Sequence, residues 1–210
     1  MIAIRFRHPL FIALLAGLAF SISGLAQTAY ERDCEKLATD QRSDTERLHE
    51  LFKLNWDYTM HEYPEYATQV GYPGLNDRWT DNSSAAIARR QHELQPTLKA
   101  IQSIRRSKLN PTDQLNYDLF KRDLEQSTEG IRFHDELMPL NQMGGVQQDA
   151  AQTLVLSPRA TVKDYENILA RLNALPAMNF AHAKRTGSRH HASARHLARR
   201  AGSSGKRNES

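Results

Sequence analysis

Residues 45–60, TERLHELFKLNWDYTM, form the stretch that decides the fold class. The apolar side chains in this stretch lie mostly three or four positions apart, with charged residues between them: Leu48, Leu51, Phe52, Leu54 and Trp56. That spacing places them on one face of an α-helix. We therefore expect an amphipathic helix here, with its aromatic residues packed in a helical core.

A second helix is predicted to follow the capping residues Asp-Asn-Ser at 81–83. The apolar positions of this helix are Ile87, Leu94, Leu98, Ile101 and Ile104. Pro96 lies inside the run. We expect it to kink or split the helix, because proline lacks the N–H that the helix needs and its ring clashes with the preceding turn.

A third helix start follows directly. Asn110 can cap a helix that has Pro111 in its first position and Asp113 in its first turn. The apolar positions after this start are Leu115, Tyr117, Leu119, Phe120 and Leu124. The sequence therefore predicts a further amphipathic helix here.

The last predicted helix begins at Thr161 and Asp164 and ends at Pro176. Its apolar positions are Tyr165, Ile168, Leu169, Leu172 and Leu175. The preceding stretch, Met138–Pro158, contains two adjacent glycines and two prolines and is expected to be the main irregular segment. The chain shows no alternating strand pattern of useful length and no internal repeat. The sequence therefore predicts an all-α fold, an extended multi-helix bundle in which several helices keep one face for a partner.

The N-terminus has the three parts of an export signal. Arg5 and Arg7 precede the apolar run Leu10–Phe20, and small residues lead to Ala26. The run is about a dozen residues long, whereas a membrane-spanning helix needs about 20. We therefore expect residues 1–26 to be a signal peptide that is cleaved after Ala26, with no permanent membrane anchor, and the mature protein to be periplasmic or secreted.

The charge is distributed unevenly. The last 33 residues carry 8 of the 28 Lys and Arg side chains and 1 of the 24 acidic ones. The rest of the chain is therefore mildly acidic, and we expect no nucleic acid as its partner. Beyond Ala181 the tail holds Leu197 as its one large apolar residue. We expect this basic tail, residues 178–210, to be disordered, because it cannot bury enough surface to offset the ordering entropy.

Several histidine-acid motifs are candidates for metal chemistry. The dipeptide His-Glu occurs at 49–50, 61–62 and 92–93, and a zincin site would need a second histidine one helical turn later. That fourth position holds Lys53, Glu65 or Pro96, so none of the three is a zincin site. His-Asp-Glu at 134–136 fails likewise, and we expect these groups to be solvated helix charges.

No other catalytic pattern is present. There is no glycine-rich phosphate loop and no Gly-x-Ser-x-Gly elbow. Cys34 is the only cysteine, so no intrachain disulfide can form, and we expect a buried or inert thiol. The sequence therefore indicates no catalytic residue, no cofactor-binding residue and no metal ligand.

The most distinctive segment is 58–81. It contains Tyr-Pro-Glu-Tyr-Ala-Thr at 63–68, then Gly71, then Leu-Asn-Asp-Arg-Trp-Thr-Asp at 75–81. This order resembles the start of the bacterial domain-of-unknown-function 885 (DUF885) family, with its Pro-Glu-x-Ala-Thr-x-x-Gly turn and aspartate-bearing segment. The resemblance covers residues 52–176. It continues through Leu109, Gln114, residues 116–119 and residues 161–165 to Arg171-Leu172.

The resemblance implies an exported helical protein that looks like a zinc-dependent peptidase, whose His-Glu-x-x-His helix would lie beyond this chain. No position here matches those ligands, so we expect zinc and a peptide-like substrate only in full-length relatives, and no catalysis by this chain. The resemblance puts residues 64–71 near the substrate cleft at most. Pro64, Gly71 and Gly74 also suit simple turn formation. The alternative function is a small exported helical binding protein whose basic tail holds a polyanion.

The composition changes abruptly after Pro176. Besides a polyanion-binding tail, translation out of frame explains this change. Back-translation of residues 182–210 with permitted codons, read one base later, gives a stop-free stretch with Gly-Ile-Thr-Pro-Pro-Arg, which is similar to what the family carries at this place. We therefore expect a frameshift near residues 178–181. Residues 27–177 would then be the N-terminal part of the family domain and an incomplete portion of its larger helical fold.

Overall fold

The computed structural model describes residues 27–137 and 145–178. Within these residues the chain forms seven α-helices, three short 3-10 helices and no strand. The predicted all-α fold is therefore confirmed. The expected signal peptide at 1–26 and all of the expected disordered tail beyond Met178 lie outside the described residues, as do residues 138–144.

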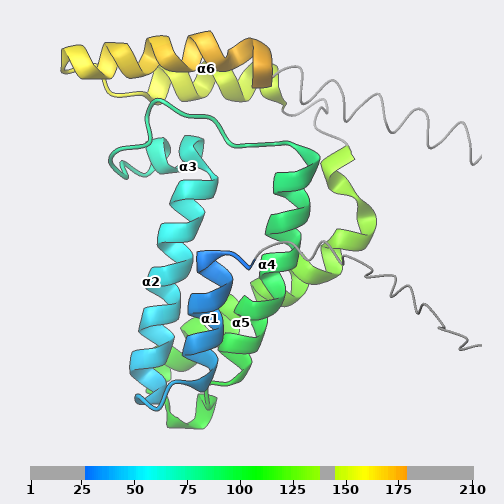
Figure 1. The fold of residues 1–210 in the computed structure, drawn as a ribbon. Coiled ribbons are helices and arrows are strands. Elements are labelled where there is room, and N and C mark those ends of the chain that lie inside the picture. Colours follow the sequence, from blue (N-terminus) through cyan, green and yellow to red (C-terminus); the bar gives the residue numbers. More distant parts are fainter. Residues whose placement is uncertain (1–26, 138–144, 179–210) are drawn as a thin grey trace, which may run out of the picture.

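Four helices make the body of the molecule. These are α1 (Ala29–Thr39), α2 (Asp44–Glu62), α4 (Ser84–Gln102) and α5 (Pro111–Gly130), which run alternately down and up beside one another (Figure 1). α1 and α5 both pack on α4. The buried core between them consists of Tyr30, Cys34, Leu37, Leu48, Leu51, Ala100, Ile101, Ile104, Leu109, Tyr117 and Leu124. The periodic apolar faces of the sequence thus build an elongated bundle.

The predicted helix starts are confirmed, because each capping side chain binds a free N–H of the first turn. The Ser83 hydroxyl accepts from the Ala86 N–H at 3.2 Å, and the Asn110 side chain accepts from the Asp113 N–H at 2.9 Å. At 161–164 the threonine hydroxyl and the aspartate carboxylate each accept from the other residue's N–H, at 3.2 and 2.8 Å. This pair is a capping box.

The helix split expected at Pro96 and the helix end expected at Pro176 are both wrong. α4 runs without interruption through Pro96, and the helix described over 162–178 continues past Pro176. A proline removes one N–H bond and crowds the preceding turn, at a cost of about 3 kcal/mol, but its φ is compatible with a helix. At Pro96, which is buried, the packing of α4 against α1 offsets that cost.

The expected irregular segment is also wrong in part, because α6 (Val146–Leu156) lies inside it. Of the glycines and prolines that suggested a loop, the two that the structure describes lie at the ends of the helix. Gly145, with φ 150°, precedes the helix, and Pro158 follows it. No glycine or proline lies within α6 itself.

Several apolar positions are exposed. Trp56, which we expected in the core, is 45% exposed on α2. Its ring lies edge-on to the ring of Tyr66 in α3, with 6.4 Å between the two centroids. The other exposed positions from the predicted apolar faces are Leu115, Leu119, Tyr165, Leu169 and Leu172.

A helical hairpin lies across one end of the bundle. It is formed by α6 and the helix over 162–178, and it lies beside the short helix α3 (Pro64–Gln69), which follows α2 (Figure 1). A small second core of Met60, Ala67 and Leu75 lies beneath it. None of the helices in the described ranges is both long and apolar enough to cross a membrane.

Candidate functional site

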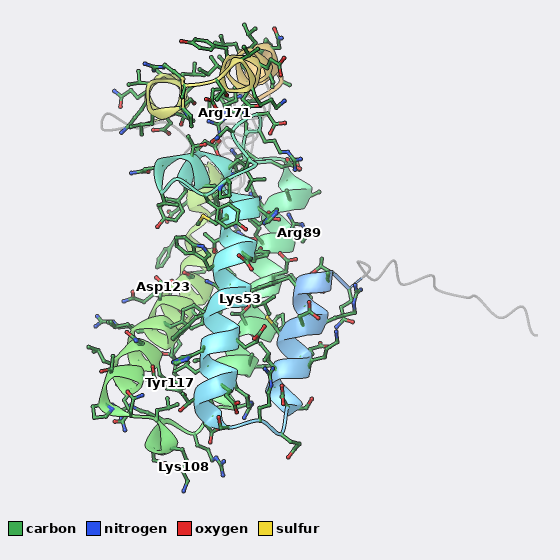
Figure 2. All side chains as sticks on the ribbon, turned by 90° about the vertical axis from the view of Figure 1, so that its left-hand side faces the viewer. Lys53, Arg89, Lys108, Tyr117, Asp123 and Arg171 are labelled. Atoms are coloured by element: carbon green, nitrogen blue, oxygen red, sulfur yellow. The ribbon has the colours of Figure 1, made fainter. Side chains whose placement is uncertain are left out.

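Arg171 joins the hairpin to the bundle. Its side chain is fully buried, and Figure 2 labels it between the hairpin and the bundle. It donates five hydrogen bonds, to the carbonyls of Arg78 (3.0 Å), Pro64 (3.1 Å) and Leu75 (3.3 Å) and to the hydroxyls of Thr68 (2.7 Å) and Ser157 (3.2 Å). One guanidinium therefore connects α3, the loop after it and both helices of the hairpin.

No carboxylate of the described chain forms an ion pair with Arg171. Burial lowers its pKa, and the more distant carboxylates of Glu65 and Asp77 act in the opposite direction. An arginine still stays charged under such conditions. Its positive charge is therefore stabilised mainly by carbonyl dipoles. The planar guanidinium in turn fixes the positions of these carbonyls.

The loop after α3 is held at several further points. Trp79 donates its indole N–H to the Arg171 carbonyl at 2.8 Å, and the Arg171 guanidinium lies over the indole ring at 5.3 Å. The Glu65 carboxylate accepts from the backbone N–H of Thr80 at 3.1 Å and from its hydroxyl at 2.5 Å. These contacts fix the aromatic side chain and the start of the next segment.

Turn formation in this loop is confirmed for its glycines. Gly71 has φ 76° and Gly74 has φ 86°, backbone angles that residues with a Cβ rarely adopt. Pro64 instead occupies the first position of α3, where its missing N–H costs nothing.

A pocket of about 380 Å³ lies between α3, the loop and the hairpin. Its lining consists of Tyr63, Glu65, Tyr66, Gln69, Trp79, Thr80, Asn82, Asp149, Ala150, Gln152, Thr153, Leu156 and Met178. Three aromatic rings thus face side chains of α6 that are mostly polar or small. Such a combination is typical of ligand sites.

Several polar groups of this pocket are free to bind a ligand. The side chains of Gln69, Asp149 and Gln152 are exposed and form no hydrogen bond or ion pair within the described part of the chain. Glu65, by contrast, is already bound to Thr80. Asp149 and Gln152 could not be found from the sequence pattern, because that pattern did not predict α6.

A second polar cluster lies inside the bundle. Glu93, expected to be solvated, is only 2% exposed, which corrects that expectation. Its carboxylate accepts from the hydroxyls of Tyr58 (2.6 Å) and Thr28 (2.8 Å) and from Arg89 (3.0 Å). Burial and the neighbouring Glu93 raise the pKa of Tyr58. The carboxylate therefore has partners on three sides, and we assign the cluster a structural role, holding α1, α2 and α4 together.

The histidines of the dipeptides lie on the bundle surface. His49 binds Asp113 at 2.9 Å, and His92 binds Glu31 at 2.6 Å, through separate imidazoles that are more than half exposed. The described residues contain no group of three or more His, Cys, Asp and Glu side chains that could hold a metal ion. The zinc implied by the family resemblance therefore does not fit the residues described, and we derive no chemistry through it.

Cys34 is buried in the core, as expected, and its thiol lies 3.8 Å from the Thr97 hydroxyl. Burial raises the pKa of the thiol to about 11. At neutral pH it is therefore protonated and a poor nucleophile.

The fold and the site define an all-helical bundle protein with an aromatic pocket at the end where the hairpin is attached. The sequence matches a family described as "Bacterial protein of unknown function (DUF885)" over residues 64–202, more than half of the chain. The chain therefore belongs to the DUF885 family. Comparisons with curated proteins and with solved structures give no significant match.

The matched range bears on the expected frameshift. A match that reaches residue 202 favours an intact reading frame over part of 178–202, whereas the sudden change of composition favours a shift. The nucleotide sequence of the gene decides between them, and the frameshift stays a prediction.

Proposed function

We propose that this chain is an exported, non-catalytic part of a peptidase-like protein, and that the pocket lined by Tyr66, Trp79 and α6 binds a segment of a peptide. The observation that supports this proposal is the position of the pocket. It lies on α3 and the adjoining loop, the segment that the family resemblance places near a substrate cleft.

The lining of the pocket suits a peptide. The exposed rings of Tyr63 and Tyr66 offer flat apolar surface for a side chain. The free amides of Gln69 and Gln152 can both donate to and accept from a peptide backbone. A volume of about 380 Å³ is at the small end of ligand pockets and suits one or two residues of a longer peptide.

The same lining argues for binding without catalysis. Among the residues that line the pocket there is no cysteine, serine or histidine, so no nucleophile can be paired with an imidazole base. The two acids of the lining, Glu65 and Asp149, have no imidazole or hydroxyl–imidazole pair to work with either, and Glu65 is engaged by Thr80. We therefore expect the chain to bind a peptide and leave it intact, and to hold no stoichiometric zinc.

Export by cleavage after Ala26 is compatible with the folded part. Thr28 caps α1 through the Glu31 N–H at 3.2 Å and also donates to the buried Glu93. Cleavage two residues earlier leaves both contacts in place. Mass spectrometry of the exported protein should find Gln27 as the first residue, and retention of residues 10–20 would contradict this part of the proposal.

The binding function is tested with one matched pair of substitutions in α6. Ala150 lines the pocket, whereas its neighbour Ala151 is exposed and does not. The mature protein is screened against a peptide library, and the best ligand is titrated while tryptophan fluorescence is recorded. Ala150→Trp should fill the pocket and abolish binding, and Ala151→Trp should leave it unchanged. Failure of every peptide to bind, or equal binding by both variants, would refute the proposal.

A further inference from the structure

We propose that the pocket selects a basic side chain, lysine or arginine, of the bound peptide. This inference rests on the proposed function and specifies its ligand. It begins from the charges of the lining. Of the residues that line the pocket, two are acidic, Glu65 and Asp149, and none is Lys or Arg.

The two acids are not equivalent. The Glu65 carboxylate is engaged by Thr80, and its charge interacts with the guanidinium of Arg171, buried behind the pocket wall. The Asp149 carboxylate is exposed and forms neither a hydrogen bond nor an ion pair with another described residue. It lies in the first turn of α6, where an acid also stabilises the helix dipole. That role leaves the oxygens of the Asp149 carboxylate able to accept hydrogen bonds. Asp149 is therefore the negative charge available to a ligand.

The aromatic rings of the pocket favour the same ligand. Two of them already have a guanidinium over one face, Arg90 over Tyr63 at 5.5 Å and Arg171 over Trp79 at 5.3 Å. Tyr66 has no such cation within the described residues and is 43% exposed. Its one ring contact is an edge contact with Trp56 at 6.4 Å. A ligand cation can therefore use the Tyr66 ring together with the Asp149 carboxylate.

The test uses three blocked pentapeptides, acetyl-Ala-Ala-X-Ala-Ala-amide, with X lysine, leucine or glutamate. Each is titrated by calorimetry into the mature protein at low and at high salt. The lysine peptide should bind about fivefold more tightly than the leucine peptide, from one exposed charge contact and one cation–π contact. The glutamate peptide should bind most weakly, and added salt should reduce the lysine preference.

Two variants locate the preference. Asp149→Asn keeps the shape of the side chain and should remove most of the preference for lysine over leucine, and Tyr66→Leu should reduce it. Glu166→Gln is the matched control, because Glu166 is an exposed acid of the hairpin that does not line the pocket. Equal binding of the lysine and leucine peptides would overturn this inference and leave peptide binding intact. If a folded mature protein binds none of the three but binds another peptide of the library, the inference fails and the proposed function stands.

Discussion

Replacing Arg171 by alanine should detach the hairpin from the bundle. The substitution removes five hydrogen bonds. The carbonyls of Pro64 and Leu75 keep another donor, the Thr68 hydroxyl and the Arg78 N–H, whereas the Arg78 carbonyl loses the Arg171 donor. Hydrogen bonds from a charged group contribute about 1.5–3 kcal/mol each. Two effects reduce the sum. The guanidinium no longer has to be desolvated, and water can enter the space it leaves. We therefore expect a net loss of about 3–5 kcal/mol.

This loss should be local. The main core of the bundle contains no residue of the hairpin, so α1, α2, α4 and α5 can stay packed when the hairpin is released. Arg171→Lys should recover only part of the loss, because one ammonium group cannot match carbonyls that lie along a planar fork. The matched control is Lys163→Ala on the same helix. Lys163 is exposed and has only a 3.6 Å contact with the equally exposed Glu166, so its removal should change stability by less than about 0.5 kcal/mol.

Hydrogen exchange followed by mass spectrometry measures the effect segment by segment. In Arg171→Ala, peptides from 146–178 and 64–80 should exchange much faster, while peptides from 84–102 keep their protection. A fluorescence change should accompany this, because Trp79 loses the cation over its ring. Unchanged exchange over 146–178 would show that other contacts hold the hairpin. Equal loss of protection in α4 would show that hairpin and bundle unfold as one unit.

Three further predictions concern the bundle. Glu93→Ala should lower the free energy of unfolding by about 3–5 kcal/mol in urea titrations, because it removes the acceptor of two hydroxyls and one of the two carboxylates that pair with Arg89, the other being Glu62. Glu35→Ala on the exposed side of α1 should have little effect. Burial tends to raise the pKa of Asp44, but hydrogen bonds from the Arg105 backbone and guanidinium lower it overall. The stabilisation that the Asp44 carboxylate contributes should therefore be present above about pH 4 and be lost as the pH falls through the lowered pKa. Asp44→Asn should reduce the free energy of unfolding at pH 7 and weaken its fall with pH in urea titrations from pH 7 to pH 2. Cys34, with its pKa raised to about 11, should resist alkylation at pH 8 until urea unfolds the bundle, and rapid labelling of the native protein would contradict its burial.

The parts of the fold that could be predicted are those that local chemistry determines. The helix starts at Ser83, Asn110 and Thr161 depend on side chains within three residues of the N–H groups they bind. The kink or split expected at Pro96 and the helix end expected at Pro176 could not be judged in this way. The cost of a proline is local, but the packing that offsets it is tertiary.

The site shows the same division between local and distant information. Family resemblance selected both Pro64–Thr68 and Arg171-Leu172, yet the contact between Arg171 and Thr68 joins residues 103 positions apart. One local signal for Arg171 was present. It lies three residues after Ile168 and four before Leu175, on the half-buried face of its helix, where a solvated arginine is not expected. A charged residue in such a position must either disrupt the helix packing or bind acceptors on another element. Here those acceptors are carbonyls of α3 and of the loop that follows it. The residue that anchors the hairpin thus also positions Trp79, so any ligand selectivity of the pocket depends on a side chain that the ligand does not touch.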